Sequence, residues 1–373
     1  MPPAEPVLIC ALSGRALAQS ARAAGFAPIV LDAFADLDTR EAGALCRRIP
    51  VDAHWRLRRG ALLAAAARLA PPPIPLVWGS GFERAPDLLA ELAEGRPLWG
   101  TEPAVVRALK DPIRFAATAQ VLGIPHPETR AEPPAHPRGW LCKRSGAAGG
   151  GHVRRAPAAG RPAGHGWYWQ RIAVGRPVSA LVAGNGIEAL VLSFSEQWPA
   201  PARGRRFRFG GVLAPAGLSA TARERLGAAA AALAAHYGIR GLASVDALVA
   251  GDAVTILELN PRPGASLEAY EQAHGVSLFA VHRAACAGEP LTALPPAGRI
   301  AGTEIVYASR GMVVPPGFVW PDWTADRTPD GSMIRAGEPV CTVRASGADR
   351  ATVKLLLRER RRRVSAPALR LAA

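Results

Sequence analysis

The sequence predicts two kinds of fold in one chain: an open α/β domain at the N-terminus, followed by a body of the α+β class. Three observations indicate this. The first hundred residues alternate between apolar strands, glycine turns and alanine-rich helices, the pattern of a parallel α/β unit. Residues 176–198 alternate as antiparallel strands do. Residues 241–260 hold two apolar strands separated only by Gly251-Asp252, a tight-hairpin signal.

The elements expected in the N-terminal unit follow from apolar periodicity and from the positions of glycine and proline. Residues 6–33 read as strand, glycine turn, helix and strand, and a further helix is expected over 58–70. Residues 73–95 add a strand, a glycine turn and a helix. Residues 97–129 add a short strand and two helices, which are separated at Asp111-Pro112 because proline cannot continue a helix.

The second part of the chain begins with a strand that runs into a glycine cluster at residues 140–151, followed by a strand at 167–172. An alanine-rich helix over 221–239 leads into the hairpin. A helix at 277–288 and a proline-rich tail with short strands complete the chain. No internal repeat is visible, and the length of 373 residues predicts two or three domains that share an interface.

Composition excludes several classes of protein. Of 373 residues, 49% are hydrophobic and 20% are charged, and no apolar run approaches the ~18 residues of a membrane span. The N-terminal residues show no basic leader, so export is not expected. The five cysteines are scattered and form no Cys-x-x-Cys pair, which favours neither a disulfide framework nor a zinc site and fits a reducing cytoplasm.

The net charge of +15 suggests an anionic partner, because basic proteins attract phosphate without sequence recognition. The arginines are nevertheless spread along the chain, and for the basic run at 358–363 a solvated helix end is favoured over a nucleic-acid-binding arm. Only three lysines occur among the 45 basic residues. Lys110 and Lys143 are therefore candidates for sites where a compact ammonium cannot be replaced by a planar guanidinium. Chance survival is the alternative for each lysine taken singly.

The hairpin carries the most informative residues. Asp246 ends one strand, and Glu258 and Asn260 end the next, so that alternate positions can aim three oxygen ligands at one point. Such ligands are those that Mg²⁺ accepts beside nucleotide phosphates. Arg262, one step further, could neutralise charge on a transferred phosphoryl group. The alternative is a surface strand end whose acid pairs with Arg262.

A second group of residues lies upstream. Lys143 stands at a strand end before the glycine loop 146–151, and such loops let backbone N–H groups close over phosphates. Lys110 precedes the break at Asp111-Pro112, and the strand 168–175 could read an adenine edge through its backbone. His152 is the histidine nearest this loop. A flexible linker would look similar to the loop alone, but not with the lysine beside it.

In their order, these motifs resemble those of the ATP-grasp superfamily. The most specific element is LELNPRPGAS at 257–266, reinforced by its spacing from Asp246. Segments at 78–83, 108–129 and 320–347 are similar to a narrower group, the predicted ATP-dependent carboligases related to biotin carboxylase, which are associated with methanopterin-type one-carbon metabolism. The resemblance implies an ATP-grasp fold preceded by a Rossmann-like α/β domain.

The resemblance also implies a domain division and roles for single residues. The parts would be an N-terminal α/β domain (1–108), a small lid (109–180), a larger subdomain with the metal site (181–292) and a β-rich closing segment with a basic tail (293–373). ATP would be bound by Lys110, Lys143, the loop residues Gly146, Gly149, Gly150 and Gly151, and the hinge residues Gln170, Arg171 and Ile172; Mg²⁺ would be held by Asp246, Glu258 and Asn260; Arg262 and Lys143 would be catalytic; Arg15 and Glu83 would face the substrate.

The reaction that the resemblance implies is attack of a substrate carboxylate on ATP to give an acyl phosphate, which an amine then captures. ADP and phosphate leave, and the product could belong to the biosynthesis of a one-carbon cofactor. The partners expected are small molecules, with a homodimer left open and neither membrane nor nucleic acid favoured. The alternatives are an ATP-dependent carboxylase that uses bicarbonate, and a non-catalytic ATP-binding or nucleic-acid-binding protein.

Two positions depart from the family pattern. Family members usually carry an acid in or just after the hinge for the ribose hydroxyls, yet residues 170–179 contain none. Biotin carboxylases place a glutamate eight residues after the first acid of the metal strand, where this chain has Ser266. The second departure makes bicarbonate chemistry less expected than carboxylate–amine ligation.

Overall fold

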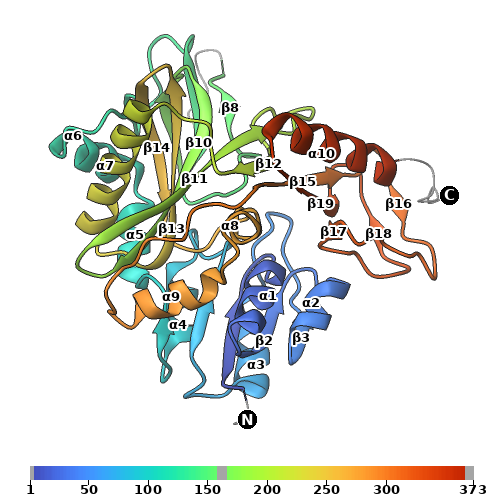
Figure 1. The fold of residues 1–373 in the computed structure, drawn as a ribbon. Coiled ribbons are helices and arrows are strands. Elements are labelled where there is room, and N and C mark those ends of the chain that lie inside the picture. The colour runs from blue at the N-terminus through green and yellow to red at the C-terminus, as the bar shows by residue number, and fades with distance from the viewer. Residues whose placement is uncertain (1–3, 158–165, 366–373) are drawn as a thin grey trace.

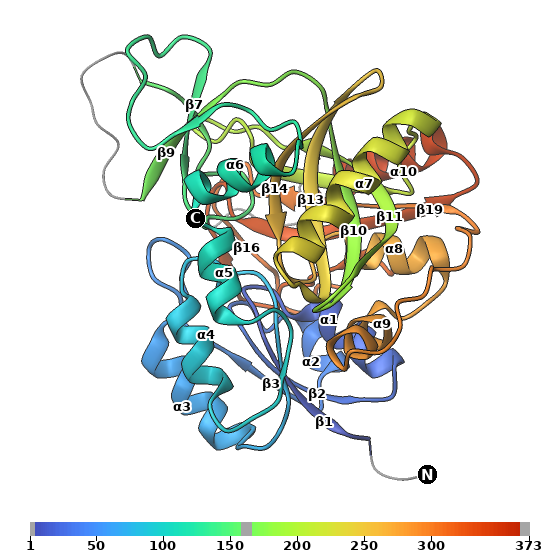
Figure 2. The same ribbon diagram turned by 90° about the vertical axis from the view of Figure 1, so that its left-hand side faces the viewer.

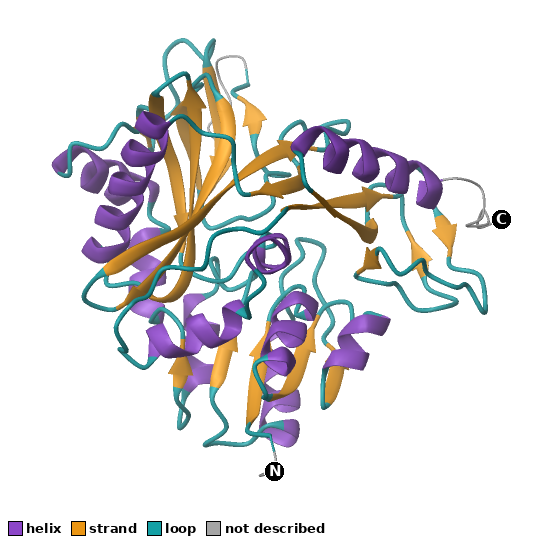
Figure 3. Cartoon of the chain, in the orientation of Figure 1, coloured by secondary structure: helices purple, strands orange, loops and turns teal. Residues whose placement is uncertain are grey.

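The N-terminal residues form a parallel sheet, as predicted. The computed structural model describes residues 4–157 and 166–365, and its first sheet has five strands in the order β3-β2-β1-β4-β5, all paired in parallel. The strands are β1 (Pro6–Cys10), β2 (Ala27–Asp32), β3 (Leu45–Arg48), β4 (Leu76–Trp78) and β5 (Leu98–Trp99). The helices around them are α1 (Arg15–Ala23), α2 (Leu37–Ala42), α3 (Arg59–Leu69) and α4 (Pro86–Ala93) (Figure 3). Strand β1 is buried after its first residue, as expected of a parallel strand covered on both faces.

The body is built on one antiparallel sheet of eight strands in the order β14-β13-β10-β11-β12-β15-β19-β17. Its strands are β10 (Arg176–Asn185), β11 (Ala189–Pro199), β12 (Phe209–Ala214), β13 (Arg240–Ala250), β14 (Ala253–Asn260), β15 (Ile300–Tyr307), β17 (Thr324–Ala325) and β19 (Pro339–Gly347). Alternate residues of β10 enter different cores: Val178, Ala180 and Val182 pack with α7 (Ala220–His236), and Leu181 and Ala183 pack with α8 (Leu267–His274) and α9 (Leu278–Cys286). The sheet is therefore covered on both faces (Figure 1).

A small lid stands apart from both sheets. It has four strands in the order β6-β9-β7-β8, namely β6 (Thr129–Arg130), β7 (Trp140–Arg144), β8 (Arg154–Arg155) and β9 (Trp167–Arg171). Its core is Trp140, Cys142 and Trp169. Figure 2 shows β7 and β9 at the top and the N-terminal sheet at the bottom, with α5 (Pro103–Leu109) and α6 (Pro112–Val121) between them. The predicted break between these helices is confirmed, and Asp111 caps α6 by accepting from the N–H groups of Ile113 and Arg114.

The C-terminal segment completes the large sheet, so the strands predicted for the tail lie beside the body strands. Strands β15, β19 and β17 continue the sheet from β12, while β16 (Met312–Val313) pairs with β18 (Met333–Ile334). The basic run at 358–363 lies in α10 (Arg350–Ser365), where Arg361 bonds to Glu304 at 2.8 Å and Arg360 lies over Trp323. The run is helical, as expected, but part of it packs on the sheet. No helix within residues 4–157 and 166–365 is long and apolar enough to cross a membrane.

Buried polar contacts join the N-terminal domain to the body. Ser20 of α1 and the N–H of Leu278 both donate to the carboxylate oxygen Oε1 of Glu271. Burial raises the pKa of Glu271 to about 7, although the hydrogen bonds from Ser20 and Leu278 oppose that rise. This contact therefore connects α1 with α8 and α9 through a carboxyl that prefers its neutral form.

The raised pKa predicts a pH-dependent effect of Glu271→Gln. A carboxyl whose folded pKa lies above its ordinary value of 4.5 contributes its full stability below that value, and this stability is lost as pH rises through about 7. Glutamine stays neutral and keeps an oxygen acceptor. We expect Glu271→Gln to leave the melting temperature unchanged near pH 4.5 and to raise it by about a degree or more at pH 8, measured by calorimetry. Exposed Glu94→Gln is the control, and an equal shift at both pH values would contradict the assignment.

Candidate functional site

Asp246 and Glu258 lie directly opposite each other on β13 and β14. The two-residue connection Gly251-Asp252 sets the register as far as the pair Ala247–Ile256. A β-bulge next to Asp246 then shifts the pairing by one residue, so that Glu258 and not Leu257 lies opposite Asp246. Asn260 Nδ2 donates to Asp246 at 3.1 Å and to Glu258 at 3.3 Å. The structure thus brings together the three residues that the sequence predicted as a group; their role as metal ligands remains a prediction.

The two carboxyl groups have opposite pKa shifts. Burial, followed by the charge of Glu258, raises the pKa of Asp246 to about 6. Burial acts in the same direction on Glu258, but the ammonium groups of Lys110 and Lys143 outweigh it and lower its pKa to about 2. The two negative charges therefore repel each other, and the ammonium groups of the two lysines stabilise the ionised form of Glu258.

This donor set fits a hard divalent cation. Two carboxylates and one carboxamide oxygen are ligands that Mg²⁺ accepts when phosphates supply the remainder. Within residues 4–157 and 166–365, no group of three or more His, Cys, Asp or Glu side chains is placed to hold a metal. Lys110 places a positive charge beside these residues: its Nζ donates to Asn260 Oδ1 at 2.7 Å and lies 4.0 Å from Glu258.

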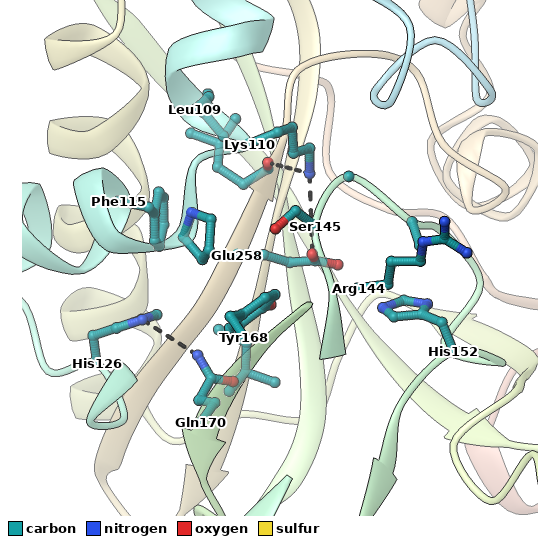
Figure 4. Close-up of a pocket in the computed structure, with 15 residues that line it drawn as sticks. Leu109, Lys110, Phe115, His126, Arg144, Ser145, His152, Tyr168, Gln170 and Glu258 are labelled. Atoms are coloured by element: carbon teal, nitrogen blue, oxygen red, sulfur yellow. Dashed lines mark hydrogen bonds and ion pairs between the residues drawn. The ribbon is translucent and has the colours of Figure 1, made fainter. Parts of the chain in front are cut away.

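Both predicted lysines lie near Glu258 and lower its pKa. Lys110 follows α5, and Nζ also donates to the carbonyl of Leu259 at 3.0 Å. Lys143 comes from lid strand β7 and donates to Gln170 Oε1 at 2.6 Å. Burial lowers the pKa of Lys143, whereas Glu258 and Asp246 act to raise it. Each lysine therefore comes from a different element, and both act on Glu258. Figure 4 shows Lys110 beside Glu258 in the pocket.

The pocket is nearly closed in this structure. Its cavity has a volume of about 30 Å³, far below the ~300–1,000 Å³ of ordinary ligand sites. The side chains around it are Leu109, Lys110, Pro112, Phe115, His126, Arg144, Ser145, Gly146, Ala147, His152, Tyr168, Gln170, Leu257, Glu258 and Leu259. A ligand as large as a nucleotide can enter only after the lid moves away from the body.

The glycine loop 146–151 holds the lid against two neighbours. A Cβ on Gly146 would lie 2.6 Å from the carbonyl oxygen of Glu83, and one on Gly150 would lie 2.0 Å from that of Phe207. Both glycines have positive φ, +65° and +68°, which side chains other than that of glycine rarely adopt. The N–H of Phe209 donates to the carbonyl of Gly149 at 2.9 Å. The predicted phosphate loop is thus packed closely between the N-terminal domain and the β11–β12 loop.

The three hinge residues behave differently from one another. The Gln170 side chain is buried and lines the pocket. The N–H of Arg171 donates to Glu128 O and that of Ile172 to Gly139 O, each at 2.9 Å. Both of these N–H groups are therefore engaged inside the lid, and the group of this strand that reaches the pocket is the Gln170 carboxamide.

Arg262 and Glu83 pair with each other. Arg262 Nε donates to Glu83 Oε1 at 2.7 Å, and the two side chains are 9% and 2% exposed. Burial raises the pKa of Glu83, but Arg262 and Lys110 lower it by more, so it remains ionised. The predicted phosphoryl-binding arginine and the predicted substrate-facing acid thus form one buried bridge between β14 and the N-terminal domain. Arg262 can contact a phosphoryl group only if this bridge is rearranged.

Arg15 lies in a different ion-pair network. It donates to Glu268 at 2.7 Å and to Asp326 at 2.9 Å and is 4% exposed. None of these residues lines the pocket. Its predicted contact with a substrate is untested, and its observed contacts connect α1 with α8 and the C-terminal segment.

Two pocket residues were not assigned a role from the sequence. His126 donates through Nδ1 to the carbonyl of Ile256 at 2.9 Å, and its Nε2 lies 3.3 Å from Gln170 Nε2. His152, noted from the sequence only for its place beside the glycine loop, also lines the pocket. No sequence signal identifies His126. It is held beside Gln170 by its hydrogen bond to Ile256 of β14, which lies 130 residues further along the chain.

The close contact of Gly150 predicts a difference between two alanine substitutions. Gly149→Ala and Gly150→Ala share the cost of positive φ, but only position 150 would collide with a carbonyl oxygen, since nothing lies within 4 Å of a Cβ at 149. We expect the Phe209 amide to exchange hydrogen at least about tenfold faster in Gly150→Ala than in Gly149→Ala, the factor that corresponds to ~1.4 kcal/mol.

Native-state hydrogen exchange measures this difference directly. Gly149→Ala is the matched control, because it tests the backbone cost without the collision. Equal exchange in the two variants would show that the loop does not rest on the Phe207 carbonyl.

Comparison with known proteins adds a domain match over part of the chain and a fold over nearly all of it. Residues 114–266 match the family of ATP-grasp domains. No curated protein matches the sequence. Solved structures are similar over nearly the whole chain. One is the N5-carboxyaminoimidazole ribonucleotide synthetase of Thermus thermophilus, with a TM-score of 0.70 and 19% identity over 96% of this chain and 98% of that one.

Two further structures show the same architecture. The biotin carboxylase of Campylobacter jejuni has a TM-score of 0.72 and 15% identity over 97% of this chain and 91% of that one. A single-chain, multi-domain long-chain acyl-CoA carboxylase has a TM-score of 0.68 and 20% identity over 98% of this chain. The present chain spans only 39% of that larger protein. At these identities, the structural similarity shows the fold alone.

Proposed function

We propose that this chain, which has the ATP-grasp fold behind an N-terminal α/β domain, is an ATP-dependent, Mg²⁺-requiring ligase. It would activate a substrate carboxylate as an acyl phosphate and join it to an amine. The observation that carries the proposal is the opposed pair Asp246 and Glu258, with the ammonium groups of Lys110 and Lys143 near enough to Glu258 to lower its pKa.

The charges of the pocket suit a triphosphate. Lys110 and Lys143 supply two ammonium groups, and Arg144 stands at the same wall. The loop 146–151 adds backbone N–H groups that can close over phosphate oxygens. Once a triphosphate is bound, Lys143 would exchange its bond to Gln170 for a phosphate oxygen, because an ammonium bonds more strongly to an anion than to a neutral carboxamide.

Asp246, Glu258 and Asn260 would hold the magnesium. When bound, Mg²⁺ neutralises phosphate charge and orients the phosphates for transfer. The chain's own contribution is the register of the hairpin, which places both carboxylates at one point, and Lys110, which would have to leave Asn260 as the cation enters.

The reaction balances in two steps. A carboxylate oxygen of the substrate attacks the γ-phosphorus of ATP, the bond to the β–γ bridging oxygen breaks, and ADP leaves with that electron pair. An amine then attacks the acyl carbon, phosphate leaves, and the amine proton passes to a base. Catalysis is supplied by positioning and by electrostatic stabilisation from Lys143. Arg262 contributes as well once it is released from Glu83.

A bicarbonate-dependent carboxylase is the second candidate, favoured by the biotin carboxylase folds among the similar structures. One of these, a 2-oxoglutarate carboxylase domain, is described as a complex with MgADP and bicarbonate. At the start of α8, however, this chain has Ser266, and the nearby Glu268 already binds Arg15 and Arg344. The ligase is therefore preferred, because no carboxylate there is free of an ion pair to act as a bicarbonate base.

The finer expectations remain part of the proposal. The expected substrates are a small carboxylic acid and a small amine. The expected context is one-carbon cofactor biosynthesis within the narrower methanopterin-associated group, in the cytoplasm. Whether the chain forms a homodimer is left open. The domain boundaries at 108, 180 and 292 and the roles of single site residues belong to the same proposal. Nucleic acid is not favoured as the partner, because the described basic run of α10 contacts Glu304 and Trp323.

Removing one pocket charge should abolish turnover. Lys143→Ala and Glu258→Gln each delete an interaction aimed at the transferred phosphoryl group or its metal, and we expect ADP release to fall at least about 10²-fold. Lys354→Ala is the matched control: it removes a lysine that binds Glu196 at 2.9 Å, on α10 and outside the pocket. ADP formation is measured by a coupled assay across pairs of carboxylates and amines.

The same assay separates the candidates. ADP release that needs bicarbonate and no amine would replace the ligase by the carboxylase. Absence of ATP binding, with a salt-sensitive shift on nucleic acid, would overturn both enzymes in favour of a binding protein.

A further inference from the structure

A second cavity follows the glycine loop along the chain and shares no lining residue with the pocket described above. Its volume is about 380 Å³, which falls within the ~300–1,000 Å³ of ordinary ligand sites. The residues that line it are Val153, Arg154, Arg155, Gly204, Arg206 and Phe207. His152 lines the first pocket and Val153 lines the second, so adjacent residues of the lid face different cavities.

The second cavity lies between the lid and the body. Arg154 and Arg155 form lid strand β8, whereas Arg206 belongs to the β11–β12 loop of the body, residues 200–208. The two walls touch where the N–H of Phe209 donates to the carbonyl of Gly149 at 2.9 Å. The cavity therefore has this shape only while the lid rests on the loop.

The body wall is held in place by its own contacts. The N–H of Arg205 donates to the carbonyl of Ala202 at 2.9 Å and closes a tight turn. The Arg208 guanidinium lies 3.5 Å from the centre of the Tyr307 ring, so this arginine fixes the base of the loop. Arg206 is exposed and lines the cavity. Its position is thus set before any ligand arrives, which reduces the entropy cost of binding.

The arginines of this cavity have no acidic neighbour in its lining. Residues 133–187, which include lid strands β7 to β9, and residues 197–223, which include the β11–β12 loop, contain no Asp or Glu, although 30 acids occur among the 373 residues. Arg59 and Arg327, by contrast, pair with Glu91 and Glu41. Positive charges therefore face each other across the cavity, and an anion between them would remove their repulsion.

We propose that this cavity binds a small polyanion, a molecule with two or more phosphate or carboxylate groups, and that the bound molecule holds the lid against the body. Guanidinium groups bind both kinds of anion through paired hydrogen bonds. A flat basic face would suit a long polyanion such as nucleic acid, whereas an enclosed volume of this size suits a small one. The inference goes beyond the proposed function and does not depend on it, because the two cavities share no lining residue.

Calorimetry with two probes tests the binding. Tripolyphosphate represents phosphates and benzene-1,3,5-tricarboxylate represents carboxylates, each titrated without magnesium into the full chain carrying Lys143→Ala, which removes a cation beside Glu258 of the first pocket. We expect at least one probe to bind. Adding Arg155→Ala from the lid wall or Arg206→Ala from the body wall should weaken it at least about tenfold, the effect of one lost hydrogen bond between charged groups.

Arg58→Ala is the matched control, because it removes an exposed arginine of the N-terminal domain that does not line the cavity. It should leave the affinity for both probes unchanged. Equal weakening in Arg58→Ala would show attraction to the overall positive charge and would overturn the site. The site is also overturned if neither probe binds, or if a probe binds the wild-type chain but not Lys143→Ala, since binding then belongs to the first pocket.

Hydrogen exchange of the Phe209 amide tests the link to the lid. At a probe concentration ten times its dissociation constant, we expect this exchange to slow about tenfold, because a ligand that binds only the closed form stabilises it by mass action. The slowing should disappear in Arg155→Ala at the same probe concentration. Binding without any slowing would overturn the claim that the polyanion holds the lid. Failure of the chain to bind Mg·ATP would overturn the proposed function and leave this result unaffected.

Discussion

The opposition of two carboxylates across the β13–β14 hairpin is the constraint on which the site depends. Asp246 and Glu258 are cross-strand partners, and like charges directly opposite each other destabilise a sheet unless a cation compensates them. The pKa of Asp246 is raised, whereas the positive charges of Lys110 and Lys143 lower the pKa of Glu258. A hairpin with no function would not need this arrangement, because a neutral side chain at either position would remove the repulsion. The pair is therefore the feature on which the proposed cation site rests.

The groups around this pair come from three separately folded parts of the chain. Lys110 follows a helix, Lys143 lies on the lid, and Arg262 is bonded to Glu83 of the N-terminal domain. The glycine loop touches the N-terminal domain at Gly146 and the β11–β12 loop at Gly150. The pocket itself lies between the lid and the body, because its lining residues fall within 109–170 and 257–259.

Much of the fold could be predicted because its signals are local. Glycine turns, the break at Asp111-Pro112 and the two-residue hairpin turn each act over a few residues. The pairing of Asp246 with Glu258 also depends on a β-bulge next to Asp246, which no sequence pattern predicts. The pairing of Arg262 with Glu83 joins residues 179 positions apart, and no spacing rule predicts such a contact. The same holds for His126 beside Gln170. The tail strands were expected, but their place in the large sheet depends on long-range pairing with β12.

The most direct test of the account is a crystal structure of the chain with Mn²⁺ and a non-hydrolysable ATP analogue. The anomalous signal of manganese locates the cation independently of any assumption about ligands. The account predicts a peak bound by Asp246 and Glu258, with Lys110 moved off Asn260 and the triphosphate beneath the glycine loop. Bound nucleotide with the manganese peak elsewhere, or with both carboxylates turned away from it, would contradict the account.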